Sequence, residues 1–473
     1  MDPPTGPTTG SYDYDMLVIG GGAGGLAVAK EAAGLRKKVL ILDLLTPSVR
    51  GSERELGGSS VNIDSIRKFL QQASLLGKAL QDSQKYGWKL KENAPHVWSD
   101  LAAAVQQTVE TRSQELKREL KNCGVFYIRA HGKIVEAHTV EVTEVNGRKR
   151  LLKAEIIVIA TGDRPQYLDI PGAREHCVTS EDLLSLPHPP GRTLVVGGSS
   201  EGLEFADFLF GLGLPVTVLL QPDLLPGFDQ KMAEKIENHM IVSGVETLHK
   251  CTLAKVEKTE AKEDVSGGSS TSTQSSKGRL QVTIITSEGQ TEQRDFDTVL
   301  LSVGSKASTS DLGLECVGVQ CSPDGRILVN ERDQTDVDHI YAVGSVQHGR
   351  PSTTGLAVHA GTLLARRLFR EDTALVYHSY YWPLEWELPA RNKYSCYVKV
   401  ICHIPDQERV LGVHILGPNA GDILQGFVAA MKCGLTKQQL DATVGLQPGS
   451  AQVFSSLTET QRMTEALMMR GNC

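Results

Sequence analysis

The first residues that could do chemistry form a glycine-rich turn near the N-terminus. A short, mainly apolar strand expected over 15–19 leads into the run 20–25 (GGGAGG), an alanine-rich helix is expected through Ala33, and a second strand over 38–42 ends at Asp43. In such a strand–turn–helix–strand unit, the glycines let a pyrophosphate approach the backbone at the helix N-terminus, and the acid accepts a hydrogen bond from a ribose hydroxyl. The pattern predicts a dinucleotide site formed by Gly20, Gly22, Gly25 and Asp43.

A second unit of the same type begins at Thr193. An apolar run leads into residues 197–202 (GGSSEG), which are followed by a predicted helix and a strand over 216–220. Two such units in one chain predict two nucleotides, and the second would contact Gly197, Ser199 and Gly202. The strand ends at Gln221, which is neither the acid that favours a free ribose nor the arginine that favours a 2'-phosphate. The motif therefore does not specify the second nucleotide.

The remaining elements place these units in a multidomain α/β protein. Apolar strands expected at 156–162 and 299–304 close the two units, and a strand at 340–344 with a helix at 357–369 returns to the first domain. From Val376 onward, strands and helices indicate an α+β domain. The Ser-, Thr- and Gly-rich run 266–277 cannot bury a core, so it is predicted to be a surface loop.

Composition narrows the function classes. The formal net charge of -7 and the lack of a basic run argue against nucleic-acid binding. No stretch of about 18 apolar residues predicts a membrane span, and no metal site is predicted. Residues 1–14 contain no Lys or Arg, so we expect a disordered lead-in and no targeting peptide, with a cytoplasmic location. The nine cysteines are expected to be reduced, and the pairs Cys316/Cys321 and Cys396/Cys402 are interpreted as packing residues.

Three motifs in the same order carry a resemblance to a known family. Residues 57–65 (GGSSVNIDS), read with 160–162 (ATG) and 416–421 (LGPNAG), closely resemble the large thioredoxin reductases of animals. These belong to the glutathione-reductase-like pyridine nucleotide-disulfide oxidoreductases. The resemblance runs from about Tyr14 to about Thr460 and implies FAD on the first unit, NADPH on the second and a homodimer formed through a C-terminal interface domain. In that family a dithiol beside the flavin passes electrons to the C-terminal redox tail of the partner subunit.

On this resemblance the expected fold is α/β, with two Rossmann-like dinucleotide-binding domains and a shortened α+β interface domain. The shortening is expected because residues 369–375 run directly into Val376, where the family has further strands. The expected parts are a lead-in (1–14), the first part of an FAD-binding domain (15–165), an NAD(P)-binding-like domain (166–306) with a flexible loop (258–280), a return to the FAD-binding domain (307–375) and the interface domain (376–473).

The resemblance also implies flavin contacts beyond the first glycine turn. Lys68 matches the lysine beside the flavin N5, and Glu204 matches its carboxylate partner. Ser345 departs from the family pattern: family members have an aspartate at this position, which holds the ribityl and pyrophosphate portion of the flavin. The further cofactor-binding residues that the resemblance implies are Gly58, Ser59, Lys68, Thr161, Gly162, Glu204, Gly304, Gly344 and Ser345.

The groups that carry the family's chemistry are replaced. Ser60 and Ser65 stand at the two dithiol positions, and a hydroxyl cannot cycle through a disulfide. Gln447 replaces the histidine that transfers protons, and Gln452 replaces the glutamate that orients it, which removes general acid–base catalysis worth about 10²- to 10⁴-fold. Gln221 and Pro226 stand where the family has arginines for the 2'-phosphate, and Ser305 replaces another arginine. Ser200 replaces a gating tyrosine, and residues 470–473 replace the redox tail.

These replacements predict a thioredoxin-reductase-like flavoprotein without NADPH-dependent disulfide reductase activity. We interpret it as a pseudoenzyme that acts as a binding or regulatory scaffold, with FAD retained and NADP(H) binding weakened. It would form a homodimer, or a heterodimer with an active thioredoxin reductase whose sites it leaves incomplete. Three alternatives stay open: an FAD-dependent NAD(P)H oxidoreductase acting on a non-disulfide acceptor, a residual thioredoxin-disulfide reductase, and a cofactor-free remnant.

Overall fold

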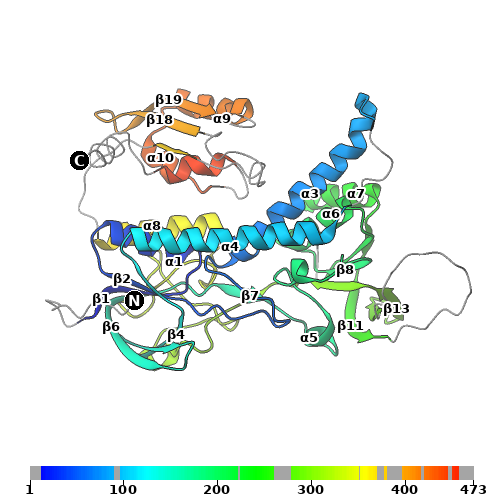
Figure 1. Ribbon diagram of the computed structural model, residues 1–473, viewed down its shortest axis with the longest axis horizontal. Helices are drawn as coiled ribbons and strands as arrows, with labels where there is room; N and C mark the ends of the chain where they lie inside the picture. Colours follow the sequence, from blue (N-terminus) through cyan, green and yellow to red (C-terminus); the bar gives the residue numbers. More distant parts are fainter. Residues whose placement is uncertain are drawn as a thin grey trace, which may run out of the picture.

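The chain folds into three parts, seen at the lower left, the lower right and the upper left of Figure 1. The computed structural model describes residues 12–89, 96–221, 224–228, 230–259, 279–350, 352–369, 378–380, 397–416, 420–445 and 450–457. Most of the predicted lead-in and flexible loop, Cys396, Gln447 and the C-terminal tail lie outside these ranges. Across them, no helix combines the length and the apolar character that a membrane span requires.

The first part is built on a parallel sheet in the order β3-β2-β1-β6, and β16 also pairs with β6. The N-terminal half of β6 continues into an antiparallel ladder with β5 and β4. β2 is buried along its whole length, as expected for a central parallel strand covered on both faces. The strands are β1 (Tyr14–Ile19), β2 (Val39–Leu42), β3 (Phe126–Ile128), β4 (Ala130–Glu136), β5 (Thr139–Glu144), β6 (Lys149–Ile159) and β16 (Ile340–Ala342).

Helices from distant parts of the sequence cover one face of this sheet (Figure 1). α1 and α8 pack closely because glycines meet: a Cβ at Gly361 would lie 2.5 Å from the carbonyl oxygen of Gly24. α3 lies beside α4 at its start and then rises away from the body. The helices of this part are α1 (Ala23–Gly34), α2 (Ser59–Asn62), α3 (Asp64–Ser83), η1 (Gln84–Tyr86), α4 (Trp98–Asn122), η3 (Leu314–Val317) and α8 (Thr354–Phe369).

The second part has its own parallel sheet, in the order β10-β9-β8-β14, beside an antiparallel sheet of β11, β12 and β13. β7 (Asp163–Pro165) and β15 (Ser305–Ala307) pair antiparallel where the chain passes between the first two parts. The elements are α5 (Ala173–His176), η2 (Leu183–Ser185), β8 (Thr193–Val196), α6 (Ser200–Gly211), β9 (Val216–Leu219), α7 (Gln230–Ser243), β10 (Glu246–Leu248), β11 (Cys251–Lys258), β12 (Leu280–Thr286), β13 (Thr291–Phe296) and β14 (Thr298–Leu301).

In the third part, the described strands form an antiparallel sheet in the order β17-β18-β19. Lys437 is fully buried, and its ammonium group donates hydrogen bonds to the Asp441 carboxylate and, at 3.1 Å, to the Leu457 carbonyl. The elements are β17 (His378–Tyr380), β18 (Tyr397–His403), β19 (Arg409–Leu416), α9 (Ala420–Lys432), α10 (Lys437–Asp441) and η6 (Ser450–Ser456).

The predicted fold class is confirmed, because two parallel sheets with helices precede a smaller α+β part. The strand expected at 156–162 is the end of the longer β6, and the strand expected at 299–304 ends at Leu301. The long helices α3 and α4 were not predicted. The interpretation of Cys316 and Cys321 as packing residues was wrong, since both are exposed, unbonded thiols beside a surface turn.

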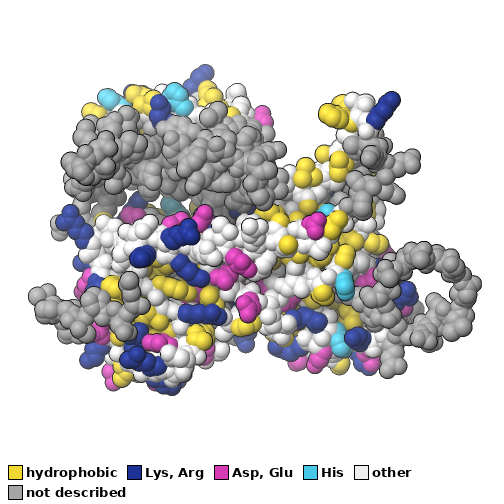
Figure 2. All heavy atoms as spheres, in the orientation of Figure 1, with side chains coloured by type: hydrophobic (Ala, Val, Ile, Leu, Met, Phe, Trp, Pro, Cys, Tyr) yellow, Lys and Arg dark blue, Asp and Glu magenta, His cyan; other side chains and the backbone are white. Residues whose placement is uncertain are grey.

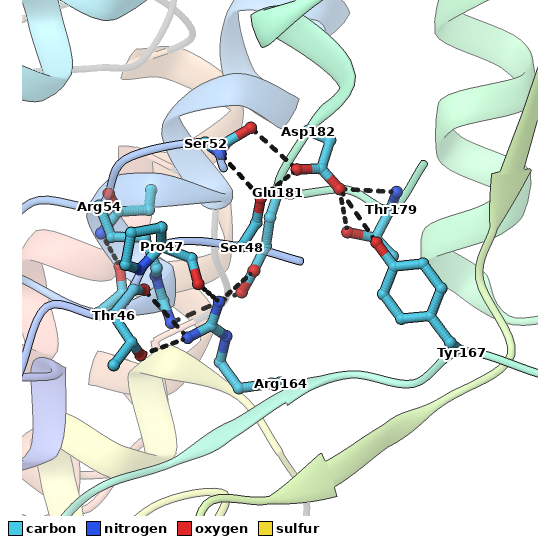
Figure 3. Close-up of polar contacts among 12 residues, drawn as sticks. Thr46, Pro47, Ser48, Ser52, Arg54, Arg164, Tyr167, Thr179, Glu181 and Asp182 are labelled. Carbon is cyan, nitrogen blue, oxygen red and sulfur yellow. Dashed lines mark hydrogen bonds and ion pairs between the residues drawn. The ribbon is translucent and has the colours of Figure 1, made fainter. Parts of the chain in front are cut away.

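A buried carboxylate, Asp182, holds the first part against the second (Figure 3). Its oxygens accept hydrogen bonds from the hydroxyls of Ser48, Ser52 and Thr179, the last two at 2.8 and 3.1 Å. The backbone N–H of Thr179 donates at 3.3 Å and the hydroxyl of Tyr167 at 3.4 Å. Because Asp182 is only 2% exposed, these donors replace the water that the charge has lost.

We expect the substitution Asp182→Ala to destabilise the protein by about 3 kcal/mol, because it leaves several buried donors without an acceptor. The measurement is the midpoint of urea or thermal unfolding. Asp169→Ala is the matched control, since Asp169 is exposed, and it should leave the midpoint unchanged. Equal midpoints for the two variants would contradict a structural role for the Asp182 cluster.

Candidate functional site

A cavity of about 880 Å³ lies between the three parts of the chain. We call it the central cavity. Its wall includes residues 20–22 of the first glycine turn, residues 199–201 of the second, and Val444 and Gly445 of the third part. The volume is in the range of ligand and cofactor sites, and both predicted nucleotide units open onto it.

The first glycine turn is shaped by backbone contacts that leave no room for side chains. A Cβ at Gly20 would lie 2.3 Å from the carbonyl oxygen of Ala160, and one at Gly25 would lie 2.1 Å from that of Gly20. Gly20 also has a φ of 112°, which favours glycine. The turn ends at Gly22, the N-cap of α1, so the unpaired N–H groups of the helix face the cavity.

A second backbone segment closes over this turn. The N–H of Gly57 donates to the carbonyl of Gly21 at 3.1 Å, and a Cβ at Gly58 would lie 2.8 Å from the Cα of Gly22. Gly58 has a φ of 62° and is the N-cap of α2. Two backbone turns therefore face each other at one end of the central cavity, with helix N-termini on both.

Two side chains at this end could bind a nucleotide. Asp43 follows β2 and lines the cavity; burial raises the pKa of its carboxyl, while the Gly21 backbone and Arg54 oppose the shift. The hydroxyl of Thr161 is buried, lines the cavity and has no hydrogen-bond partner among the described residues. A buried hydroxyl without a partner is costly, so a ligand donor or acceptor at this point would satisfy it. The residues present fit a dinucleotide.

The serines at the dithiol positions differ in placement. Ser60 lines the cavity, and its hydroxyl donates to the carbonyl of Gly57 at 2.6 Å. Ser65 is 7% exposed and lies off the cavity wall. No described cysteine lines the cavity either. The wall as described therefore offers no thiol to a bound flavin.

The predicted pairing of Lys68 with Glu204 was wrong. Both residues line the cavity, but Glu204 accepts hydrogen bonds from Arg67, whose Nε lies 2.8 Å from Glu204 Oε2 and whose Nη2 is closer still. Asp64 holds the same guanidinium, 3.3 Å from its Nη1. The planar fork of an arginine can bind two carboxylates at once, which leaves Lys68 without an ion pair to any described residue.

The second glycine turn is folded as predicted, but several of its polar groups already bond to other groups of the protein. A Cβ at Gly197 would lie 2.1 Å from the Ser302 carbonyl oxygen. The Ser199 hydroxyl caps α6 by accepting the N–H of Gly202 at 3.1 Å. Gln221 is also occupied, because its Oε1 accepts the backbone N–H of Leu253 at 3.1 Å.

Around Ser345 the structure adds an arginine that sequence reasoning missed. Arg326 donates to the backbone carbonyl of Ser345, to Asp163 at 3.2 Å and to the Ser305 hydroxyl at 3.1 Å. Ser305 in turn donates to Asp163. The position that holds an aspartate in the family is thus part of an internal polar network, and no local motif in the sequence signals it.

Most predicted site residues meet at the central cavity. Gln447 lies outside the described residues, and Gln452 does not line the cavity but lies beside Gly445, which does. Gly25, Gly197 and Gly202 form the interiors of the turns and do not line the cavity. The predicted residues on the wall are Gly20, Gly22, Asp43, Gly58, Ser59, Ser60, Lys68, Thr161, Gly162, Ser199, Glu204, Gly304, Gly344 and Ser345.

Two Rossmann-type units that open onto one cavity define the class of α/β proteins whose folds carry two dinucleotide-binding units. The family model for pyridine nucleotide-disulphide oxidoreductases matches residues 14–361, and the model for their dimerisation domain matches residues 370–457. The chain belongs to this family. It is 38% identical to a thioredoxin reductase of Emiliania huxleyi over 505 aligned positions, which cover 97% of this chain and 98% of that protein. The resemblance to thioredoxin reductases is therefore confirmed.

Proposed function

We propose that this thioredoxin-reductase-like protein is a pseudoenzyme that binds FAD, lacks disulfide reductase activity and acts by binding a partner. The observation that carries the proposal is the pair Ser60 and Ser65, because neither side chain can form a disulfide. Ser60 uses its hydroxyl in its own turn, as a donor to Gly57. Assays of NADPH-dependent reduction of thioredoxin and of a disulfide dye test the proposal, and activity at ordinary enzyme rates would overturn it.

The first glycine turn supports FAD binding. Gly22, Gly58, Asp43 and the unpartnered hydroxyl of Thr161 all line one end of the central cavity. Backbone N–H groups at a helix N-terminus would hold the pyrophosphate, and Asp43 would accept a ribose hydroxyl. On this proposal the purified protein is yellow, whereas a cofactor-free remnant is colourless.

The substitution Gly58→Ala should lower flavin affinity by at least about tenfold, because the added Cβ, 2.8 Å from the Gly22 Cα, must push the two turns apart. Flavin absorbance per chain and titration of the apoprotein with FAD measure this. Gly51→Ala is the control, since Gly51 also has a positive φ, of 87°, but a Cβ there meets open space. Wild-type flavin affinity in Gly58→Ala would rule out this turn as the flavin site.

Restoring the two thiols should not restore the family's activity. The double substitution Ser60→Cys and Ser65→Cys leaves Gln447, Gln452 and Pro226 in place, so proton transfer and the phosphate clamp stay absent. We expect thioredoxin reduction to remain at background in an NADPH-coupled assay. Recovery to within about tenfold of an active thioredoxin reductase would show that the other replacements matter little.

A second candidate function is an FAD-dependent NAD(P)H oxidoreductase that reduces a non-disulfide acceptor, such as oxygen or a quinone. Lys68 and Glu204 favour it, because both line the cavity at positions that flank the flavin in the family. An anaerobic titration with NADH and NADPH decides between the two functions. A flavin that stays oxidised removes this candidate, and rapid bleaching of the flavin favours it.

A surface on α3 supports partner binding. The second half of α3 and the residues after it rise from the body and expose a hydrophobic stripe, which we call the α3 arm (Figures 1 and 2). Large exposed apolar groups of this kind mark interaction surfaces. The arm consists of Leu75, Leu76, Leu80, Tyr86 and Trp88, which are 45–83% exposed.

We propose that the α3 arm and the dimerisation domain together bind a second subunit, as a homodimer or as a heterodimer with an active thioredoxin reductase. In the family each active site combines the dithiol of one subunit with the histidine and tail of the other. A mixed dimer would therefore have two incomplete sites, and this chain would lower the activity of its partner.

Charged substitutions on the arm should weaken this association. Leu76→Glu with Leu80→Glu removes apolar surface worth about 1.5–3 kcal/mol per side chain, so we expect dissociation to increase by more than about tenfold. Co-expression pull-down and sedimentation velocity measure it. The control is Ile241→Glu with Val242→Glu on α7, where both side chains are exposed. Equal association of the two variants would exclude the arm from the interface.

A further inference from the structure

Four charged side chains form one cluster between α3 and α6. Arg67 on α3 pairs with Glu204 on α6, with 2.8 Å between Nε and Oε2, and with Asp64 on its own helix, with 3.3 Å between Nη1 and Oδ1. Asp64 also accepts the hydroxyl of Thr354, at the start of α8, at 2.8 Å. We define the Arg67 cluster as Asp64, Arg67, Glu201 and Glu204.

The Arg67 cluster lies on the wall of the central cavity, between the two glycine turns. All four of its side chains line the cavity, as do Ser199 and Ser200 of the second turn and Gly20 of the first. A nicotinamide nucleotide held at the second turn must extend along this wall to bring its ring to a flavin held at the first. The cluster therefore lies on the route of the hydride donor.

The start of α6 carries an acidic side chain where a helix N-terminus would otherwise favour an anion. Glu201 is in its first turn, where a bound pyrophosphate would otherwise lie, and Ser199 already accepts the N–H of Gly202. Burial raises the pKa of the Glu201 carboxyl, and Ser180 and Arg67 oppose the shift. A phosphate placed there would raise this pKa further, so a nucleotide could bind only together with a proton or by displacing the side chain.

Among the described residues, Arg67 is the cation that acts on Glu201, and Lys68, which also lines the cavity, does not act on this carboxyl. The guanidinium of Arg67 is shared by two carboxylates, and a phosphate would have to replace them as its partner. Gln221 and Pro226 supply no charge, and Gln221 is bonded to the backbone of Leu253. The residues present in the second unit do not fit a nicotinamide nucleotide.

We propose that the Arg67 cluster excludes nicotinamide nucleotides from the second dinucleotide unit, so that this chain has no route for hydride from NADH or NADPH to a bound flavin. The exclusion comes from the charged side chains of the Arg67 cluster and does not depend on the missing dithiol. Only its redox readout rests on the proposed FAD site. The second unit then serves the fold, through the sheet of β8, β9 and β14 and through the contact of α6 with α3.

The test compares wild type with Arg67→Met/Glu201→Val, which removes one charge of each sign and frees Glu204 to pair with Lys68. NADP⁺ binding to the purified holoprotein is measured by titration calorimetry. We expect no saturable binding by wild type up to about 1 mM, and at least about tenfold tighter binding by the variant. Anaerobic mixing with NADPH should leave the wild-type flavin oxidised.

The matched control is Lys78→Met/Asp207→Asn, which removes another ion pair between α3 and α6 that lies outside the cavity, with both side chains about 40% exposed. It should behave as wild type. The isosteric Glu201→Gln keeps the fold and should give a smaller gain in NADP⁺ binding.

Micromolar binding of NADP⁺ by wild type would overturn the proposal. Equal NADP⁺ binding by wild type, Arg67→Met/Glu201→Val and Glu201→Gln would overturn it as well. Thioredoxin reduction is assayed in parallel. Activity there would overturn the pseudoenzyme, whereas NADP⁺ binding without such activity would overturn only the exclusion by the Arg67 cluster.

Discussion

The whole molecule depends on a point where three backbone segments meet without side chains between them. Gly20 lies against the carbonyl of Ala160, Gly25 against that of Gly20, and Gly58 against Gly22, each at a distance that no Cβ could occupy. This contact joins β1, α1, β6 and the segment before α3 into one unit. A larger residue would push these segments apart, so close packing alone already favours glycine at these positions, whatever chemistry the cavity supports.

Packing constrains the backbone of the segment 57–62, whereas any redox chemistry would depend on the side chain at position 60. The backbone of residues 57–62 is fixed by the approach to the first turn, whereas the side chain at position 60 is free to change as long as its polar atom finds a partner. Ser60 finds one in the Gly57 carbonyl, and Asn62 bonds to Gly58 and to the backbone of Glu55. A hydroxyl in place of a thiol at position 60 therefore has a hydrogen-bond partner within the turn itself.

The sequence predicts the parts of the site that depend on local geometry and misses the parts that depend on packing. Glycine turns, the first strands and Asp43 follow from short patterns, so they could be placed in advance. The pair of Arg67 and Glu204 joins residues 137 positions apart, and it forms only because α3 packs on α6. Arg326 reaches Asp163 across 163 positions. Side-chain partners at such separations follow from the fold, and Lys68 was assigned the wrong partner for this reason.

Three arginines on the wall of the central cavity are already paired with carboxylates. Arg54 and Arg164 on its wall both pair with the buried Glu181, at 3.5 and 2.7 Å, as Figure 3 shows, and Arg67 pairs with carboxylates of α3 and α6. Taking such a guanidinium away from its carboxylate leaves a partly buried charge without a partner. These arginines are therefore not free to bind a phosphate, which leaves backbone N–H groups at helix N-termini and the unpaired Lys68 as candidate phosphate ligands on the described wall. Residues of the first glycine turn line the cavity, whereas at the second Ser199 accepts the N–H of Gly202 and Glu201 adds a carboxyl, and the proposed exclusion of a second nucleotide rests on this contrast.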